Sequence, residues 1–122
     1  MKEPRESLSK LITRQDAGRL LGRCGRNGKS LALANGCFDI LHIGHVRYLK
    51  AAKDTAEILL VAVNSDLSVK KLKGDRRPVV PEMERAEVIA SLECVDHVVI
   101  FGEETVRELI EEVEPDFHCK GG

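Results

Sequence analysis

The sequence predicts an α/β protein of one domain, with a parallel sheet covered by helices. Short apolar runs alternate with segments of helical spacing along most of the 122 residues. The run "EILLVAV" (57–63) has the continuous apolar character of a central parallel strand, which is buried on both faces. Strands that alternate with helices through short connections indicate a parallel sheet.

Composition excludes several other classes of protein. A length of 122 residues suits a single core, and a formal net charge of −1 gives no bulk attraction to nucleic acid or anionic lipid. The longest apolar run, Ile58–Val63, is too short to span a bilayer, and the first ten residues lack the apolar core of a signal peptide. The four cysteines contain no C-x-x-C pair, so we expect free thiols in a cytoplasmic protein.

The first part of the chain, residues 1–29, is predicted to be a helical segment that precedes the core of residues 30–122. Thr13 followed by Asp16 resembles a helix-starting cap. An apolar stripe follows at Ala17, Leu20 and Leu21, and "RNGK" (26–29) is a turn signal that ends the helix.

The core is predicted to contain four strands and three helices. The strands are "LALAN" (31–35), "EILLVAV" (57–63), "HVVIF" (97–101) and the shorter "DFHC" (116–119). One helix follows the first strand, with Val46, Leu49 and Ala52 at helical spacing. A basic loop (72–81) leads to a helix that starts at Pro81, with its inner side at Ala86, Val88, Ile89 and Leu92. The last helix (103–114) turns Val106, Leu109, Ile110 and Val113 inward.

Unusual residues follow the strands on the side where a parallel sheet binds ligands. Ligands of such sheets lie beyond the carboxyl ends of the strands. The segment after the first strand, "NSD" (64–66) after the second and "FGEE" (101–104) after the third all belong to that edge. The sequence therefore predicts a site there.

The segment "HIGH" (42–45) has the chemistry of a phosphate clamp. A helix that begins near Ile43 and Gly44 points free N–H groups and a positive dipole end at the sheet edge. Gly36 and Gly44 let a phosphate approach the backbone, and His42 and His45 can face one ligand. We expect these imidazoles to be cations beside a phosphate and to stabilise charge on an α-phosphate during nucleotidyl transfer. A phosphate nucleophile already carries charge and needs no general base.

Two other interpretations of this segment stay open. Cys37, His42 and His45 could ligate zinc, although no clear fourth ligand follows them. The two histidines could also be polar residues that cap an ordinary helix, although glycines on both sides at the strand edge are unusual for that role.

The stretch "NGCFDILHIGHVRYLKAAK" (35–53) resembles the signature of the HIGH-motif nucleotidyltransferase (cytidylyltransferase-like) superfamily. More narrowly, "NSD", "LKGDRRP" and "VD", followed by "PDFHCKGG", resemble bacterial heptose 1-phosphate adenylyltransferases, often one domain of a kinase–adenylyltransferase fusion. The resemblance extends from Thr13 to Gly122 and implies a Rossmann-like fold. The family continues after "KGG" with a further strand and helix, so we expect this chain to be short at that end.

The resemblance implies roles for individual residues. The catalytic group would be His42, His45 and Lys73. The nucleotide would also contact Gly36, Cys37, Phe38, Gly44, Lys120 and Gly121. The acceptor substrate would contact Asp39, Asp66, Lys73 and Arg85. Asp39 would orient a histidine or help to hold Mg²⁺, or would only cap its turn.

The implied reaction transfers AMP from ATP to D-glycero-D-manno-heptose 1-phosphate, giving ADP-heptose and pyrophosphate for lipopolysaccharide core synthesis, with Mg²⁺ bridging the phosphates. The alternatives are a cytidylyltransferase acting on glycerol phosphate or another alcohol phosphate, and a non-catalytic nucleotide-binding module. The expected partners are ATP and a sugar 1-phosphate, without nucleic acid or membrane. We also expect a homodimer or higher homo-oligomer.

Overall fold

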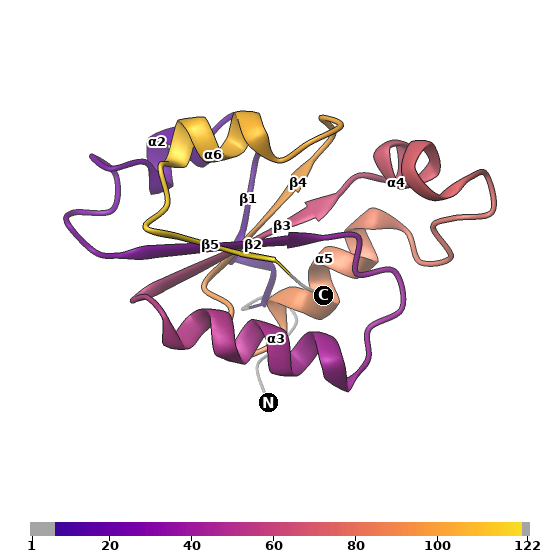
Figure 1. Cartoon of the computed structure of the whole chain (residues 1–122), viewed down its shortest axis with the longest axis horizontal. Helices are drawn as coiled ribbons and strands as arrows, with labels where there is room; N and C mark the ends of the chain where they lie inside the picture. Colours follow the sequence, from indigo (N-terminus) through magenta and orange to yellow (C-terminus); the bar gives the residue numbers. More distant parts are fainter. Residues whose placement is uncertain (1–6, 121–122) are drawn as a thin grey trace.

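Five parallel strands form one sheet through the centre of the molecule (Figure 1). The computed structural model describes residues 7–120. The strands are β1 (Leu11–Ile12), β2 (Leu31–Gly36), β3 (Ile58–Asn64), β4 (His97–Phe101) and β5 (Phe117–Lys120). Their order across the sheet is β1-β4-β3-β2-β5, and each neighbouring pair is parallel. The predicted α/β, Rossmann-like architecture is confirmed.

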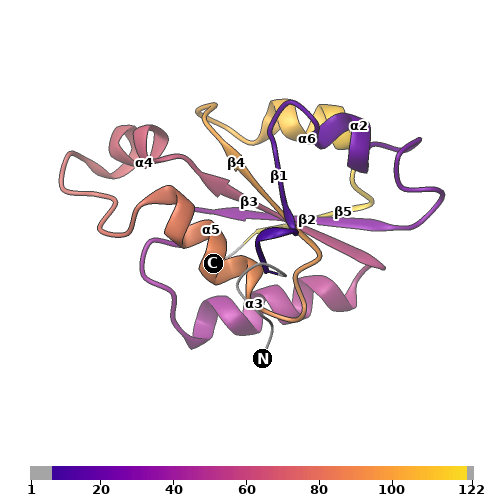
Figure 2. The ribbon, with the colours of Figure 1, turned by 180° about the vertical axis from the view of Figure 1, so that it is seen from behind.

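Helices cover both faces of the sheet, as the two opposite views show (Figures 1 and 2). The short α2 (Ala17–Leu21) and α6 (Arg107–Val113) lie on one face. The other face carries α3 (Ile43–Asp54) and α5 (Glu82–Ala90). Beyond the carboxyl end of β3 lies α4 (Asp66–Lys73). None of the helices between residues 7 and 120 is long and apolar enough to cross a membrane.

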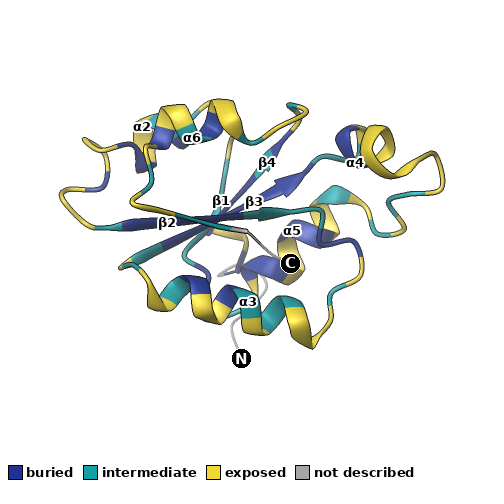
Figure 3. Ribbon diagram, viewed as in Figure 1, coloured by how far each residue is buried: buried dark blue, intermediate teal, exposed yellow. Residues whose placement is uncertain are grey.

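The side chains of each strand alternate between two apolar layers. In β2, Leu31 and Leu33 pack with α2 and α6, whereas Ala32 and Ala34 pack with α3 and α5, and all four are fully buried. This double burial explains why the strands are continuous apolar runs. The buried sides of the helices face the sheet (Figure 3).

The predicted strands of the core are confirmed, whereas the last helix begins at Arg107 and not at residue 103, and three further details of the sequence analysis need correction. The segment predicted to be helical contains the strand β1, in which Leu11 pairs with Val98. A strand of two residues is too short for an alternating apolar pattern to be recognised in the sequence. Val88 is 44% exposed, because α5 packs through Ala86, Ile89 and Ala90 on its other side. The basic loop begins only after Lys73, where α4 ends.

The order of the strands creates a switch point beside β2. The chain passes from β2 to β3 and β4 on one side, then returns through α6 to β5 on the other side of β2. Crevices for ligands form at the carboxyl ends of strands where the direction of winding changes in this way. The carboxyl ends of β2 and β5 therefore border the expected site.

A buried guanidinium closes the opposite end of the fold. The side chain of Arg26 is 3% exposed and donates hydrogen bonds to four carbonyl oxygens, those of Leu21, Lys29, Val113 and Glu114. Two of these belong to the carboxyl end of α6, where free carbonyl groups and the helix dipole favour a cation. Arg26 therefore joins the turn after α2 to α6.

We expect Arg26→Ala to lower the free energy of unfolding by about 3 kcal/mol, because it leaves buried carbonyl groups without donors. Urea denaturation measures this change. Arg23→Ala is the control, since Arg23 is 66% exposed and its pair with Glu114 contributes less than about 1 kcal/mol. Equal effects of the two substitutions would contradict this role of Arg26.

Candidate active site

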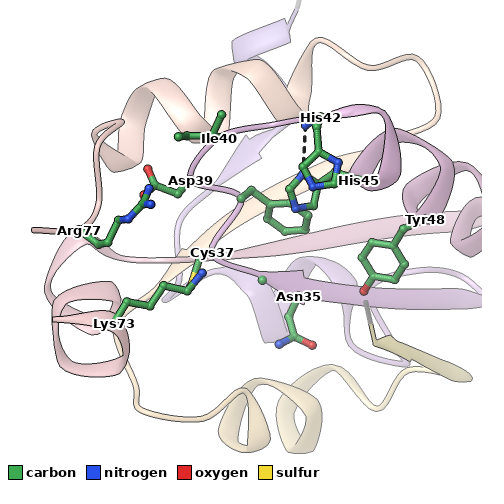
Figure 4. Close-up of a pocket in the computed structure, with 11 residues that line it drawn as sticks. Asn35, Cys37, Asp39, Ile40, His42, His45, Tyr48, Lys73 and Arg77 are labelled. Atoms are coloured by element: carbon green, nitrogen blue, oxygen red, sulfur yellow. Dashed lines mark hydrogen bonds and ion pairs between the residues drawn. The ribbon is translucent and has the colours of Figure 1, made fainter. Parts of the chain in front are cut away.

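A hollow of about 650 Å³ lies at the carboxyl edge of the sheet. It is formed by the end of β2, the loop that follows, the first turns of α3, the end of α4 and the loop after α4 (Figure 4). Its lining residues are Asn35, Gly36, Cys37, Phe38, Asp39, Ile40, His42, His45, Tyr48, Lys73 and Arg77. Seven of the residues predicted from the sequence meet here: Gly36, Cys37, Phe38, Asp39, His42, His45 and Lys73.

His42 and His45 cap the first turn of α3 and cap each other. Nδ1 of His42 accepts a hydrogen bond from the Gly44 backbone N–H at 3.0 Å. Nδ1 of His45 accepts from the His42 backbone N–H at 3.2 Å, which completes a capping box. The capping interpretation of the motif is therefore correct, and the two rings, with centroids 4.1 Å apart, also line the hollow.

The capping bonds decide the protonation of both rings. A ring nitrogen that accepts a hydrogen bond carries no hydrogen, so each neutral imidazole has its hydrogen on Nε2. Burial, followed by the charges of His42 and Lys73, lowers the pKa of His45 below its usual value. The expectation of cationic imidazoles concerns rings beside a bound phosphate and stays a prediction, although protonation of Nδ1 would cost either ring its capping bond. Each neutral ring keeps one Nε2–H donor for a ligand.

Phe38 forms the floor beneath the histidines. Its ring is 6% exposed and meets His45 edge-on, with centroids 5.5 Å apart. Its backbone φ of 48° is unusual for a residue with a side chain. A Cβ at Gly36 would lie 3.2 Å from this ring, so glycine leaves room for it. The loop after β2 therefore turns sharply and places the Phe38 ring against His45.

Asp39 holds the loop that follows α4. Its carboxylate accepts hydrogen bonds from the backbone N–H groups of Val79 and Val80 and from the Arg77 guanidinium. Burial acts to raise the pKa of Asp39, but these hydrogen bonds and the Arg77 charge outweigh it and hold the pKa below its usual value. Asp39 contacts neither histidine in any hydrogen bond of the described chain, and its partners lie about 40 positions away instead of in its own turn, which corrects both the histidine-orienting and the turn-capping expectations.

This arrangement does not fit Asp39 as a magnesium ligand. Both carboxylate oxygens already accept hydrogen bonds, and the Arg77 Nη1 lies 3.1 Å from one of them. Between residues 7 and 120, no three His, Cys, Asp or Glu side chains gather as a group that could hold a metal ion. The same finding applies to Cys37, His42 and His45, considered above as zinc ligands.

Arg85 lies beneath the hollow instead of facing it, which corrects the expectation that it contacts the substrate. Its side chain is fully buried and donates hydrogen bonds to the carbonyl oxygens of Cys37, Asn64 and Val80. Its remaining partner is the Asp66 carboxylate at 2.7 Å. Arg85 and Asp66 therefore join three segments of the site and are positioning residues.

Two cations face the histidines across the hollow (Figure 4). Lys73 is the last residue of α4, and Gly74 ends that helix with a φ of 97°. Arg77 was missed by the sequence analysis, although the basic loop that contains it was noted. Arg77 belongs to the loop that follows α4, so the attachment of this loop to Asp39 helps to determine where the charge of Arg77 lies.

Tyr48 was also missed, and it connects α3 to β5. Its hydroxyl donates a hydrogen bond to the carbonyl oxygen of Cys119. It lies three residues after His45, on the same face of α3, so helical spacing could have indicated it. Lys120 lies opposite Asn35 in the pairing of β5 with β2, whereas Gly121 lies outside the described residues.

A second hollow of about 560 Å³ adjoins the first on the α6 side of the sheet. It shares one lining residue, Asn35, with the first hollow. Its other lining residues are Asn64, Leu72, Phe101, Glu104, Thr105, Val106, Arg107, Ile110 and His118. This wall is more apolar than that of the first hollow and carries fewer cations.

The sequence profile of the cytidylyltransferase-like family matches residues 33–122, which contain most of β2, all of α3 and every lining residue of both hollows. The chain belongs to the cytidylyltransferase-like family. Within this family it is 58% identical over 97 residues to the bifunctional protein HldE of a Nitratiruptor species, covering 80% of this chain and 21% of the relative. It is 52% identical over 103 residues to HldE of Helicobacter pylori, covering 84% and 22%.

A solved structure agrees with this assignment to the cytidylyltransferase-like family. The lipopolysaccharide core biosynthesis protein from Thermoplasma volcanium matches with a TM-score of 0.67 and 35% identity, covering 75% of this chain and 73% of that chain. The present chain spans about a fifth of the length of the HldE proteins named above.

We expect an NMR titration of His45 to give a midpoint below 6.5, the ordinary value for histidine. Between that midpoint and 6.5 the unfolded chain binds more protons, so the free energy of unfolding should fall as the pH drops below about 6.5. Lys73→Gln should raise the midpoint by removing a positive charge, and Lys70→Gln on the same helix is the control. A wild-type midpoint at or above 6.5 would contradict the neutral capping arrangement.

Proposed function

We propose that this domain is a nucleotidyltransferase that transfers AMP from ATP to D-glycero-D-manno-heptose 1-phosphate, giving ADP-heptose and pyrophosphate. The observation that carries the proposal is the pair of histidine Nε2–H donors at the start of α3, opposite Lys73 and Arg77 in one hollow. Membership of the cytidylyltransferase-like family and likeness to HldE and to a lipopolysaccharide core biosynthesis protein support it.

The arrangement suits direct attack by one phosphate on another. An oxygen of the acceptor phosphate forms a bond to the α-phosphorus of ATP, and the bond from that phosphorus to the bridging oxygen breaks. The electron pair leaves with pyrophosphate. The acceptor oxygen is already an anion, so no side chain has to remove a proton.

The side chains of the hollow would stabilise the charge that moves during this step. His42 and His45 would donate their Nε2–H groups to phosphate oxygens at the helix N-terminus, where the dipole also favours anions. Lys73 would pair with the β- and γ-phosphates and the pyrophosphate that they become. Gly36, Cys37 and Phe38 would form the loop beneath the nucleotide, with Lys120 and Gly121 beside it.

Magnesium would be held by the phosphates of ATP, since Asp39 is committed to its loop. The ion would offset phosphate charge and help to orient the groups. The protein itself would supply hydrogen-bond donors and positive charge at fixed positions.

The reaction is tested by pyrophosphate release with ATP or CTP as donor and heptose 1-phosphate or glycerol phosphate as acceptor. We expect release with ATP and heptose 1-phosphate to exceed the other combinations. Preference for CTP with glycerol phosphate would replace the proposal with the cytidylyltransferase alternative. Binding of ATP without turnover by any acceptor would favour a nucleotide-binding module.

Two substitutions of His45 separate its catalytic donor from its capping role. His45→Glu retains an acceptor for the His42 N–H, as glutamate does in a capping box, but has no N–H donor, whereas His45→Ala loses both the acceptor and the donor. We expect both variants to lose two to three orders of magnitude, about 10²–10³-fold, in kcat. Only His45→Ala should also lose about 1 kcal/mol of stability. Near-normal turnover by His45→Glu would contradict a role for the Nε2–H group.

A further inference from the structure

One face of the sheet ends in polar side chains at the switch point. Along β2, Leu31 and Leu33 are buried against the α6 layer, and Asn35 is the next residue on that face. Leu33 is paired with His118 across β2 and β5, so Asn35 and His118 are diagonal neighbours on the same face. The apolar layer therefore gives way to this pair where the two strands end.

His118 fixes the orientation of the Asn35 amide. Nε2 of His118 lies 2.7 Å from Oδ1 of Asn35, so this nitrogen carries the hydrogen and donates it to the amide oxygen. The amide nitrogen of Asn35 has no hydrogen-bond partner among residues 7–120. Its N–H groups are therefore held ready as donors at the sheet edge.

Asn35 stands on the boundary between the two hollows, because it lines both of them. Two substrates that react with each other must meet where their binding sites join. The first hollow contains both histidines, Lys73 and Arg77, which suits the polyanionic triphosphate. The second combines apolar side chains with amide and hydroxyl groups and with Glu104 and Arg107, all of which can hydrogen-bond the hydroxyl groups of a sugar.

We infer that the second hollow binds the sugar of the acceptor, and that Asn35, oriented by His118, donates a hydrogen bond to the acceptor phosphate at the junction with the ATP site. This inference rests on the proposed function. Asn35 would contact the substrate, whereas His118 would be a positioning residue that acts through Asn35.

The amide donor would assist the attack without taking part in bond making. The acceptor phosphate has one oxygen that attacks the α-phosphorus and others that stay behind. A donor to one of the latter would orient the group and reduce repulsion between the two phosphates. This hydrogen bond would strengthen the binding of the acceptor far more than that of ATP, because ATP would lie against the cations of the first hollow.

The test compares binding of the acceptor and of ATP by calorimetry in the full-length protein. Heptose 1-phosphate is titrated in the presence of α,β-methylene-ATP, and ATP is titrated alone. In Asn35→Ala we expect the Kd for heptose 1-phosphate to rise about tenfold to a hundredfold and that for ATP to change less than about twofold. Asn35→Asp keeps the acceptor for His118 but has no N–H, so we expect a loss at least as large.

The role of His118 is tested by a pair of substitutions. His118→Leu removes the donor to Asn35, and we expect the Kd for the acceptor to rise about threefold to tenfold. His118→Gln keeps an amide N–H near the position of Nε2 and should restore affinity to near the wild-type value. Asn27→Gly is the control, since it removes an asparagine from a turn at the other edge of the sheet, where φ is 51°.

The possible outcomes separate this inference from the proposed function. Wild-type protein that binds ATP but no heptose 1-phosphate would overturn the proposed acceptor. Wild-type binding of both with unchanged acceptor affinity in Asn35→Ala and Asn35→Asp would overturn the role of Asn35 alone. A greater loss of ATP affinity than of acceptor affinity would also overturn it, because Asn35 would then belong to the nucleotide site.

Discussion

The buried guanidinium of Arg85 is the constraint on which the site depends. A charge with no exposed surface is tolerated only when its donors are satisfied, and losing its partners would be costly. Arg85 obtains them from the loop after β2, the end of β3 and the loop before α5. These three segments must converge around it, and the hollow lies above their meeting point. The buried hydrogen bonds of Arg85 thus determine the geometry of the hollow at the surface.

The histidine pair shows how local folding and chemistry share the same atoms. Nδ1 of each ring satisfies a backbone N–H at the start of α3 that would otherwise lack a partner. The same bond orients the ring and leaves its hydrogen on Nε2, much as the hydrogen-bond partners of metal-bound histidines fix their tautomer. Folding of the helix therefore prepares the donors, and a ligand need not reorganise them.

The two faces of the sheet present different chemical groups at its carboxyl edge. On the α3 and α5 face, the first hollow gathers positive and donor groups from the loops after β2 and α4. On the α6 face, the strands end in Asn35, Asn64 and His118 around a less charged hollow. Because β2 lies at the switch point, its last residues are open to both sides. The position of β2 in the sheet thus explains why Asn35 borders both hollows.

The sequence by itself determined the elements whose signals are local. Continuous apolar runs identified the four strands of the core and their parallel packing, and the position of His42 and His45 after a strand indicated a helix N-terminus at the binding edge. Residues 36–45 could be assigned to the site for the same reason, since they directly follow β2. Such patterns need only neighbours within one or two turns of helix or strand.

Only the tertiary structure decided the features that depend on residues distant in the chain. The strand β1 forms because Leu11 pairs with Val98, which lies far along the chain. Arg85 can be buried because folding brings to it partners that lie up to 48 positions away in the sequence. His118 meets Asn35 across 83 positions for a similar reason. A lone arginine or histidine has the same local pattern whether it faces solvent, a ligand or the core. Its role is determined by which segments the folded sheet brings to it.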